Sequence, residues 1–152
     1  MEPEPLDPIL IQVTVPLPLS MIFAGLTEPA QLSQWLCKSA SVEPRLGGRF
    51  DLDFDEPQAF TSHGQVTHFQ PDVDVGFTWE APSPFAKLMN TPGRPTTIYL
   101  RLQESPEGID VTLEHAGWGS EELWGEARSW HFVLWDDRLH RFKDYLLKAA
   151  YG

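Results

Sequence analysis

Three side chains that can carry a positive charge stand at apolar positions of this sequence. At 100° per residue, Arg128 and His131 fall on the same helical stripe as Trp124 and Trp135. His115 alternates in phase with apolar residues of a predicted strand. A buried charge without a partner costs several kcal/mol. We therefore expect these groups to meet an internal carboxylate, water or the anionic head of a ligand.

Two other interpretations of the same residues stay open. Arg128 could reach a wet cavity mouth while both histidines bind backbone carbonyls. Alternatively, His131 could act as general acid or base while Arg128 stabilises an oxyanion or enolate, as in a cyclase, lyase or hydrolase. No activated nucleophile accompanies them, so we expect binding rather than catalysis and name no catalytic residue.

No other motif points to a cofactor or a metal. Cys37 is the only cysteine and ends a predicted helix, which is not the low-pKa setting of a catalytic thiol. Asp51, Asp53 and Asp55 alternate, but the glycine and distal glutamate of an EF-hand loop are missing. They indicate the solvated face of a strand. The five histidines are scattered, so we expect neither cofactor nor metal.

Charge and hydropathy limit the partners and the location. The formal net charge of -11 repels nucleic acid and anionic membrane surfaces alike. No uncharged apolar run approaches the roughly 20 residues that a bilayer-spanning helix needs. The start of the sequence lacks the basic residues and apolar run of a signal peptide, and a disulfide cannot form within the chain. These features predict a cytoplasmic protein without membrane insertion.

The pattern of apolar residues predicts one domain over residues 9–152, after a loose tail over residues 1–8. Strands are predicted at 9–15, 50–54, 64–70, 75–79, 98–102 and 109–115, short helices at 19–26 and 28–36, and a long helix from about Ser120. Sequential strands joined by turns favour an antiparallel sheet with one covered face. The long helix is the cover, with a stripe formed by Trp124, Phe132, Trp135, Leu139, Phe142, Leu146 and Ala149.

The connection over residues 81–95 is unusually long for a compact domain. Ser83 and Pro84 suit the start of a helix, and the residues after them are apolar at helical spacing. We expect a short helical lid or partner-docking loop that presents Phe85, Leu88 and Met89. An ordinary surface insertion packed by Phe85 and Leu88 is the alternative.

Several short motifs follow one another in a definite order: VTVP at 13–16, LTEP at 26–29, LGGRF at 46–50, FTWE at 77–80, GIDVTLEH at 108–115 and FKDYL at 142–146. Together with the order of elements, they resemble the START-like (SRPBCC) superfamily and, within it, the activator of heat-shock-protein-90 ATPase homologue family. The resemblance implies an α+β helix-grip (START-like, Bet v 1-like) fold. In it, a curved antiparallel sheet of about six strands wraps around the C-terminal helix, with two short helices after the first strand.

The resemblance also implies a cavity between sheet and terminal helix, which relatives use for lipids, polyketides and other apolar molecules. The leading expectation is binding of a small hydrophobic or amphipathic ligand, and an anionic head on it would suit the cationic groups. One alternative is a co-chaperone or protein-interaction module of the ATPase-activator type, and another is the enzyme using His131 and Arg128. The expected ligand-binding residues are Arg128, His131, His115, Trp124, Phe132, Trp135, Trp79, Phe77, Phe50 and Phe54.

Overall fold

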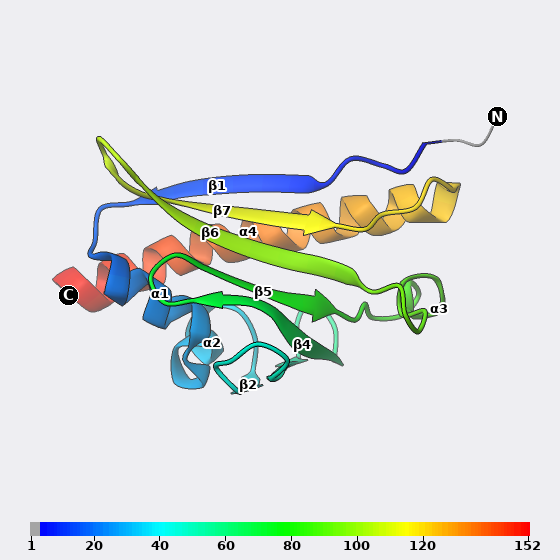
Figure 1. Ribbon diagram of the computed structural model, residues 1–152, viewed down its shortest axis with the longest axis horizontal. Coiled ribbons are helices and arrows are strands. Elements are labelled where there is room, and N and C mark those ends of the chain that lie inside the picture. Colours follow the sequence, from blue (N-terminus) through cyan, green and yellow to red (C-terminus); the bar gives the residue numbers. More distant parts are fainter. Residues whose placement is uncertain (1–3) are drawn as a thin grey trace.

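A seven-stranded antiparallel sheet and one long helix form the body of the molecule (Figure 1). The computed structural model describes residues 4–152. In chain order the elements are β1 (Ile9–Val15), α1 (Leu19–Thr27), α2 (Pro29–Trp35), β2 (Ser39–Val42), β3 (Arg49–Phe54), β4 (Phe60–Gln70), β5 (Asp74–Trp79), α3 (Ala86–Met89), β6 (Thr96–Ser105), β7 (Gly108–Ala116) and α4 (Glu122–Tyr151). The strands lie in the order β1-β7-β6-β5-β4-β3-β2. This is the helix-grip fold that the sequence predicted.

The alternation of side chains explains which face of the sheet is covered. In β1 every second residue from Ile9 to Val15 is buried while Leu10 and Gln12 are exposed. In β7 the same period buries Ile109 and the odd positions after it. Successive side chains on a strand point to opposite faces, so both strands direct their apolar residues toward α4. Figure 1 shows α4 running along that face, with α1 and α2 near its C-terminal end and α3 near the other end.

The structure has one strand more than the six predicted. β2 consists of Ser39, Ala40, Ser41 and Val42, which carry no apolar alternation and are partly or fully exposed. It pairs only with β3, at the edge of the sheet. An edge strand of this kind is held by backbone hydrogen bonds and not by a buried face, so hydrophobic periodicity does not reveal it.

The long helix begins at Glu122, close to the predicted start, but its buried face differs from the predicted stripe. Trp135 and three predicted residues after it, Leu139, Phe142 and Leu146, are buried. The predictions for Phe132 and Ala149 are wrong, since Phe132 is 43% exposed and Ala149 is also exposed. The buried face instead includes Ala127, Leu134 and Arg138. The buried face of α4 is therefore rotated about the helix axis relative to the predicted stripe, of which Phe132 was a member.

The described residues before β1 are attached to the rest of the molecule. The backbone N–H of Leu6 donates to the carbonyl of Gly119, at 3.1 Å. Arg128 donates from Nε to the carbonyl of Asp7 at 2.7 Å and from Nη2 to that of Pro8 at 3.1 Å. Residues 6–8 thus lie against the start of α4. The division into a tail and a domain at residue 9 stays a prediction.

Within residues 4–152, none of the helices is both long and apolar enough to cross a membrane.

Candidate functional site

Two histidines and two tryptophans form two adjacent hydrogen-bonded pairs between the sheet and α4. The indole N–H of Trp79 donates to Nε2 of His131 at 2.9 Å, and that of Trp135 donates to Nδ1 of His115 at 3.0 Å. The two imidazole rings lie 5.2 Å apart, nearly perpendicular. None of the four side chains is more than 1% exposed.

The second nitrogen of each imidazole is also bonded, and this fixes the tautomers. Nδ1 of His131 lies 2.7 Å from the carbonyl oxygen of Ala127, which can only accept, so Nδ1 carries the proton. His115 accepts the indole proton at Nδ1, so its Nε2 donates to the hydroxyl of Thr96 at 3.0 Å. Both rings are neutral donor–acceptor bridges, and neither has a nitrogen left for a substrate.

Burial removes the positive charge that the sequence allowed at these positions. Desolvation lowers the pKa of His131 to about 4. It lowers the pKa of His115 well below the ordinary value, and the neighbouring His131 adds to that shift. Arg128 points away, toward the carbonyls of Asp7 and Pro8. The prediction that three cationic groups converge on the interior is therefore wrong, and the general-base role considered for His131 has no support.

The expected aromatic lining is a packed core. Phe50 stacks on Phe77 with ring centroids 3.9 Å apart, and Phe54 meets the edge of Trp79 at 5.7 Å. All of these rings are buried, and Trp135 lies 5.0 Å from Trp79. Side chains thus occupy the space where the family resemblance implies a cavity.

Two of the predicted lining residues lie outside this core. Trp124 is half-buried near the N-terminal end of α4, where it meets Trp118 edge to face at 6.1 Å. Phe132 is exposed on the helix one turn after Arg128. The ligand-binding role assigned to the ten residues stays a prediction, and the structure brings seven of them together: His115, His131, Trp79, Trp135, Phe50, Phe54 and Phe77.

The connection over 81–95 contains the predicted short helix, α3, but it packs inward. Phe85 and Met89 are buried in the core, and only Leu88 of the three predicted residues is partly accessible. The side chain of Asn90 accepts from the backbone N–H of Ala81 at 2.7 Å and donates to its carbonyl at 2.9 Å. This pair of bonds fixes the first residue of the connection to the end of α3. A lid or docking role for it stays a prediction.

An open groove of about 640 Å³ runs along one flank of α4. Trp130, Val133 and Leu134 of the helix form its apolar wall, and Pro57 of the β3–β4 turn lies opposite. Trp130 also meets the edge of Phe60 at 6.3 Å, so the wall continues into the sheet. Val133 is 68% exposed, so part of this apolar wall faces water.

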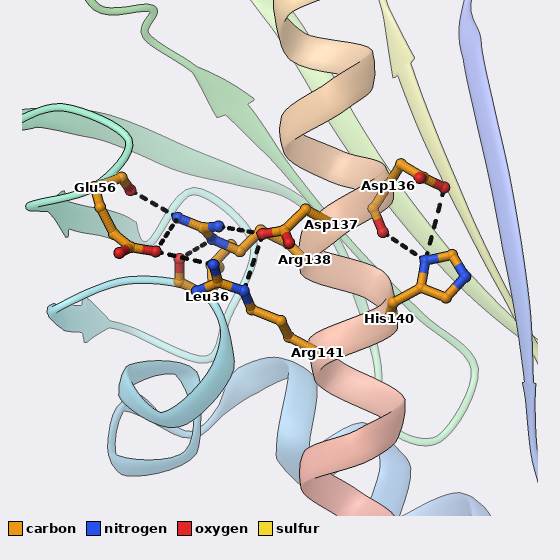
Figure 2. Close-up of polar contacts among 7 residues, drawn as sticks. All are labelled: Leu36, Glu56, Asp136, Asp137, Arg138, His140 and Arg141. Atoms are coloured by element: carbon orange, nitrogen blue, oxygen red, sulfur yellow. Dashed lines mark hydrogen bonds and ion pairs between the residues drawn. The ribbon is translucent and has the colours of Figure 1, made fainter.

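One end of the groove carries four charged side chains, drawn in Figure 2. Arg138 is only 3% exposed. It donates from Nε to the carbonyl of Leu36 at 2.8 Å, from Nη2 to the carbonyl of Glu56 at 2.6 Å, and from Nη1 to the carboxylate of Asp137 at 2.5 Å. These bonds join α4 to the end of α2 and to the β3–β4 turn. Arg138 is therefore a structural cation whose donors are largely engaged.

Arg141, one turn further along α4, completes the cluster at its accessible side. Its Nη2 lies 2.9 Å from Oε1 of Glu56 and its Nε lies 2.9 Å from Oδ2 of Asp137. In Figure 2, Glu56 reaches these arginines from the turn, while Asp136 and His140 form a separate pair on the other side of the helix.

A second hollow of about 190 Å³ lies beyond the ion pairs, beside Trp35 and Cys37. Glu56, Arg138 and Arg141 line both hollows, so the ion pairs stand between them. Burial raises the pKa of the Cys37 thiol to about 12, which keeps it protonated and unsuited to nucleophilic attack.

The groove was missed in the sequence, although one signal for it was available. Arg138 falls on the same helical face as His131, Trp135 and Phe142, which are all buried. A buried arginine at such a position needs hydrogen-bond acceptors inside the protein, and we expected this of Arg128 but not of Arg138. The backbone acceptors of Arg138 belong to Leu36 at the end of α2 and to Glu56 in the β3–β4 turn, and nothing in the sequence pattern links these two segments to α4.

Comparison with known proteins identifies the family of the chain. A family profile described as "Activator of Hsp90 ATPase homolog 1-like protein" matches residues 16–146. No curated protein matches the chain in sequence.

Solved structures share the fold at low sequence identity. The protein MLL2253 from Mesorhizobium loti superposes with a TM-score of 0.75 and 17% identity, over 93% of this chain and 97% of that chain. The Aha1 dimer from Colwellia psychrerythraea, solved in solution, gives a TM-score of 0.70 and 18% identity over 93% and 96%. DynU16, from the dynemicin biosynthetic locus, gives 0.75 and 20%, but the match covers 95% of this chain and 49% of that one.

Proposed function

This chain belongs to the Activator of Hsp90 ATPase homolog 1-like family, and on that premise we propose that it binds a small apolar or amphipathic molecule in the groove beside α4. The proposal keeps the kind of ligand that the family resemblance implied and changes its place. Packed aromatic rings and two fully bonded imidazoles occupy the interior, whereas the flank of α4 is open.

The exposure of Val133 in the apolar wall of the groove is the observation that carries this proposal. Small-molecule sites are typically concave, mostly apolar and about 300 to 1,000 Å³ in volume, and the groove has about 640 Å³. Trp130, Leu134 and Pro57 supply the apolar surface around Val133. A ligand that covers this surface gains roughly 25 cal/mol for each Å² of apolar area removed from water.

Titration of the protein with 1-decanol tests the proposal, because an uncharged chain probes the apolar wall alone. Trp130 lies in the groove, so its fluorescence should change on binding, and Trp130→Phe should remove that change. Val133→Asp places a charge in the wall and should weaken binding at least about tenfold. Leu46→Asp is the matched control, since Leu46 is 64% exposed and lies outside the groove.

Both aspartate variants should unfold in urea within about 0.5 kcal/mol of wild type, because neither replaced side chain is buried. Equal decanol affinity for Val133→Asp and wild type, or no decanol binding at all, would contradict the groove as a ligand site.

A protein partner is the second candidate, and a specific feature of α4 favours it. Leu123, Phe132 and Val133 are exposed apolar residues along the same helix, and the similar Aha1 fold from Colwellia psychrerythraea was solved as a dimer. If a second copy covers the helix, light scattering should show a concentration-dependent dimer that Val133→Asp dissociates. A monomer at all concentrations, together with decanol binding, favours the small molecule.

A further inference from the structure

We propose that the carboxylate of Glu56 occupies the position of a ligand's anionic head. The groove would then take an amphipathic monocarboxylate, whose head displaces Glu56 from Arg141 while its chain covers Val133. This inference rests on the proposed function, and it adds the chemical class of the ligand and the way in which the site opens.

The two arginines of the cluster differ in how firmly their partners hold them. Arg138 is buried and donates to two backbone carbonyls, so its position is part of the fold. The side chain of Arg141 is 47% exposed, and both of its partners are exposed carboxylates. A charge-assisted pair of this kind exchanges one carboxylate for another without losing its bond type. Arg141 is therefore the cation that a ligand can reach.

The carboxylate of Glu56 can leave at little cost. Its side chain is 62% exposed, and its Oε1 lies 3.9 Å from Nη2 of Arg138, compared with 2.9 Å from Nη2 of Arg141. An exposed ion pair contributes little to stability because water and salt screen it. The backbone carbonyl of Glu56 stays bonded to Arg138, so the turn keeps its anchor when the side chain swings away.

Local charge favours displacement over simple addition. The groove is lined by Glu56, Asp137, Arg138 and Arg141, so acidic and basic groups balance. A ligand carboxylate added to the intact cluster would leave one negative charge in excess, while one that replaces Glu56 restores the balance. Displacement also removes a side chain that lines both hollows, which lets the ligand reach toward Cys37.

Decanoate and 1-decanol, titrated at pH 7.5, separate the head from the chain. The affinities of wild type for decanoate and for 1-decanol should differ by no more than about threefold. The ion pair that decanoate forms with Arg141 replaces the one that Glu56 loses, so the net gain is small. Glu56→Gln removes the competing carboxylate with almost no change in shape and should raise the affinity for decanoate about two- to fivefold, with no change for decanol. In the double variant with Arg141→Met, that gain should disappear.

Three outcomes would overturn the inference: unchanged decanoate affinity in Glu56→Gln, an equal gain for decanol, or a gain that survives Arg141→Met. Urea unfolding of each variant identifies any loss of fold, and Glu56→Asp, which keeps the charge, should behave like wild type. If decanol binds and Val133→Asp weakens it while Glu56→Gln has no effect, only the head-group inference fails. If neither ligand binds any of the proteins, both proposals fail.

Discussion

The inner face and the groove flank of α4 use similar side chains in opposite ways. On the inner face, Trp135 and His131 have all their polar atoms bonded inside the protein and no exposure above 1%. On the flank, Val133 faces water and Arg141 is held by exposed acids. The residues described contain no buried side-chain nitrogen or oxygen without a partner.

This difference indicates where the helix can change its contacts. A buried donor or acceptor that loses its partner costs about 1 to 3 kcal/mol, so the inner network keeps a single arrangement. Groups on the flank exchange partners with water or a ligand at low cost. His131 and Trp135, which the sequence suggested as ligand-binding residues, therefore belong to the part that keeps a single arrangement, and the exposed ion pairs that can exchange partners lie on the flank beside it.

Truncation of Trp135 should cause the largest loss in the free energy of unfolding. A small loss would contradict the contrast between the inner face and the flank of α4. Trp135→Ala removes a buried ring and leaves Nδ1 of His115 without its donor, so we expect a loss of about 3 to 5 kcal/mol in the free energy of unfolding. Val133→Ala should change it by no more than about 0.5 kcal/mol. Urea denaturation measures both, and comparable losses for the two variants would mean that the inner face is not the core.

Acid should destabilise the inner network in the range where the unfolded histidines become protonated. Burial depresses the pKa of His131 to about 4, while an unfolded histidine has a pKa of about 6.5. The contribution of the neutral His131 to the free energy of unfolding is complete above about pH 6.5. It is lost as the pH falls toward 4, because in this range the imidazole binds a proton only in the unfolded chain. Each buried imidazole should contribute about 1.4 kcal/mol per pH unit.

Urea midpoints between pH 7.5 and 5 measure this dependence. His131→Asn removes one titrating group and should roughly halve the slope that His115 and His131 produce together. A free energy of unfolding that stays constant across the range would mean that the imidazoles are open to solvent.

The two arginines provide the finest test of the comparison. Arg138→Met leaves the carbonyls of Leu36 and Glu56 without their donor and should cost about 2 kcal/mol. Arg141→Met breaks only exposed ion pairs and should cost no more than about 0.5 kcal/mol. Thermal and urea unfolding in low and high salt distinguish the two variants. A larger loss in the free energy of unfolding for Arg141→Met than for Arg138→Met would mean that Arg138 is not the structural cation.

The fold could be predicted from the sequence because its pattern is local. β1 and β7 show a period of two, and α4 keeps a mostly apolar stripe from Ala127 to Leu146, so each element is recognised without its neighbours. β2 could not be found this way, since its four residues gain their structure from pairing with β3.

The site was harder to predict because it depends on contacts between distant segments. Arg138 and Glu56 are 82 residues apart, and only the folded chain brings them together. The helical phase correctly placed His131 and Trp135 inside. A small error in the centre of the predicted stripe, however, included the exposed Phe132 and left out the buried Arg138. The sequence also could not show that His131 on α4 accepts from the indole of Trp79 on β5, or that His115 on β7 accepts from the indole of Trp135 on α4.

The order of strands also has a consequence for synthesis. β1 pairs with β7, so Ile9 and Val15 cannot form their pairs with His115 and Ile109 until those residues have been synthesised. A ribosome adds about 5 to 20 residues per second, and the roughly 100 residues between the partners take about 5 to 20 s to appear. During that time the apolar side of β1 has no sheet to join. The first strand of the nascent chain therefore keeps its backbone hydrogen-bonding groups unpaired until β7 has been synthesised, and only then becomes an edge of the finished sheet.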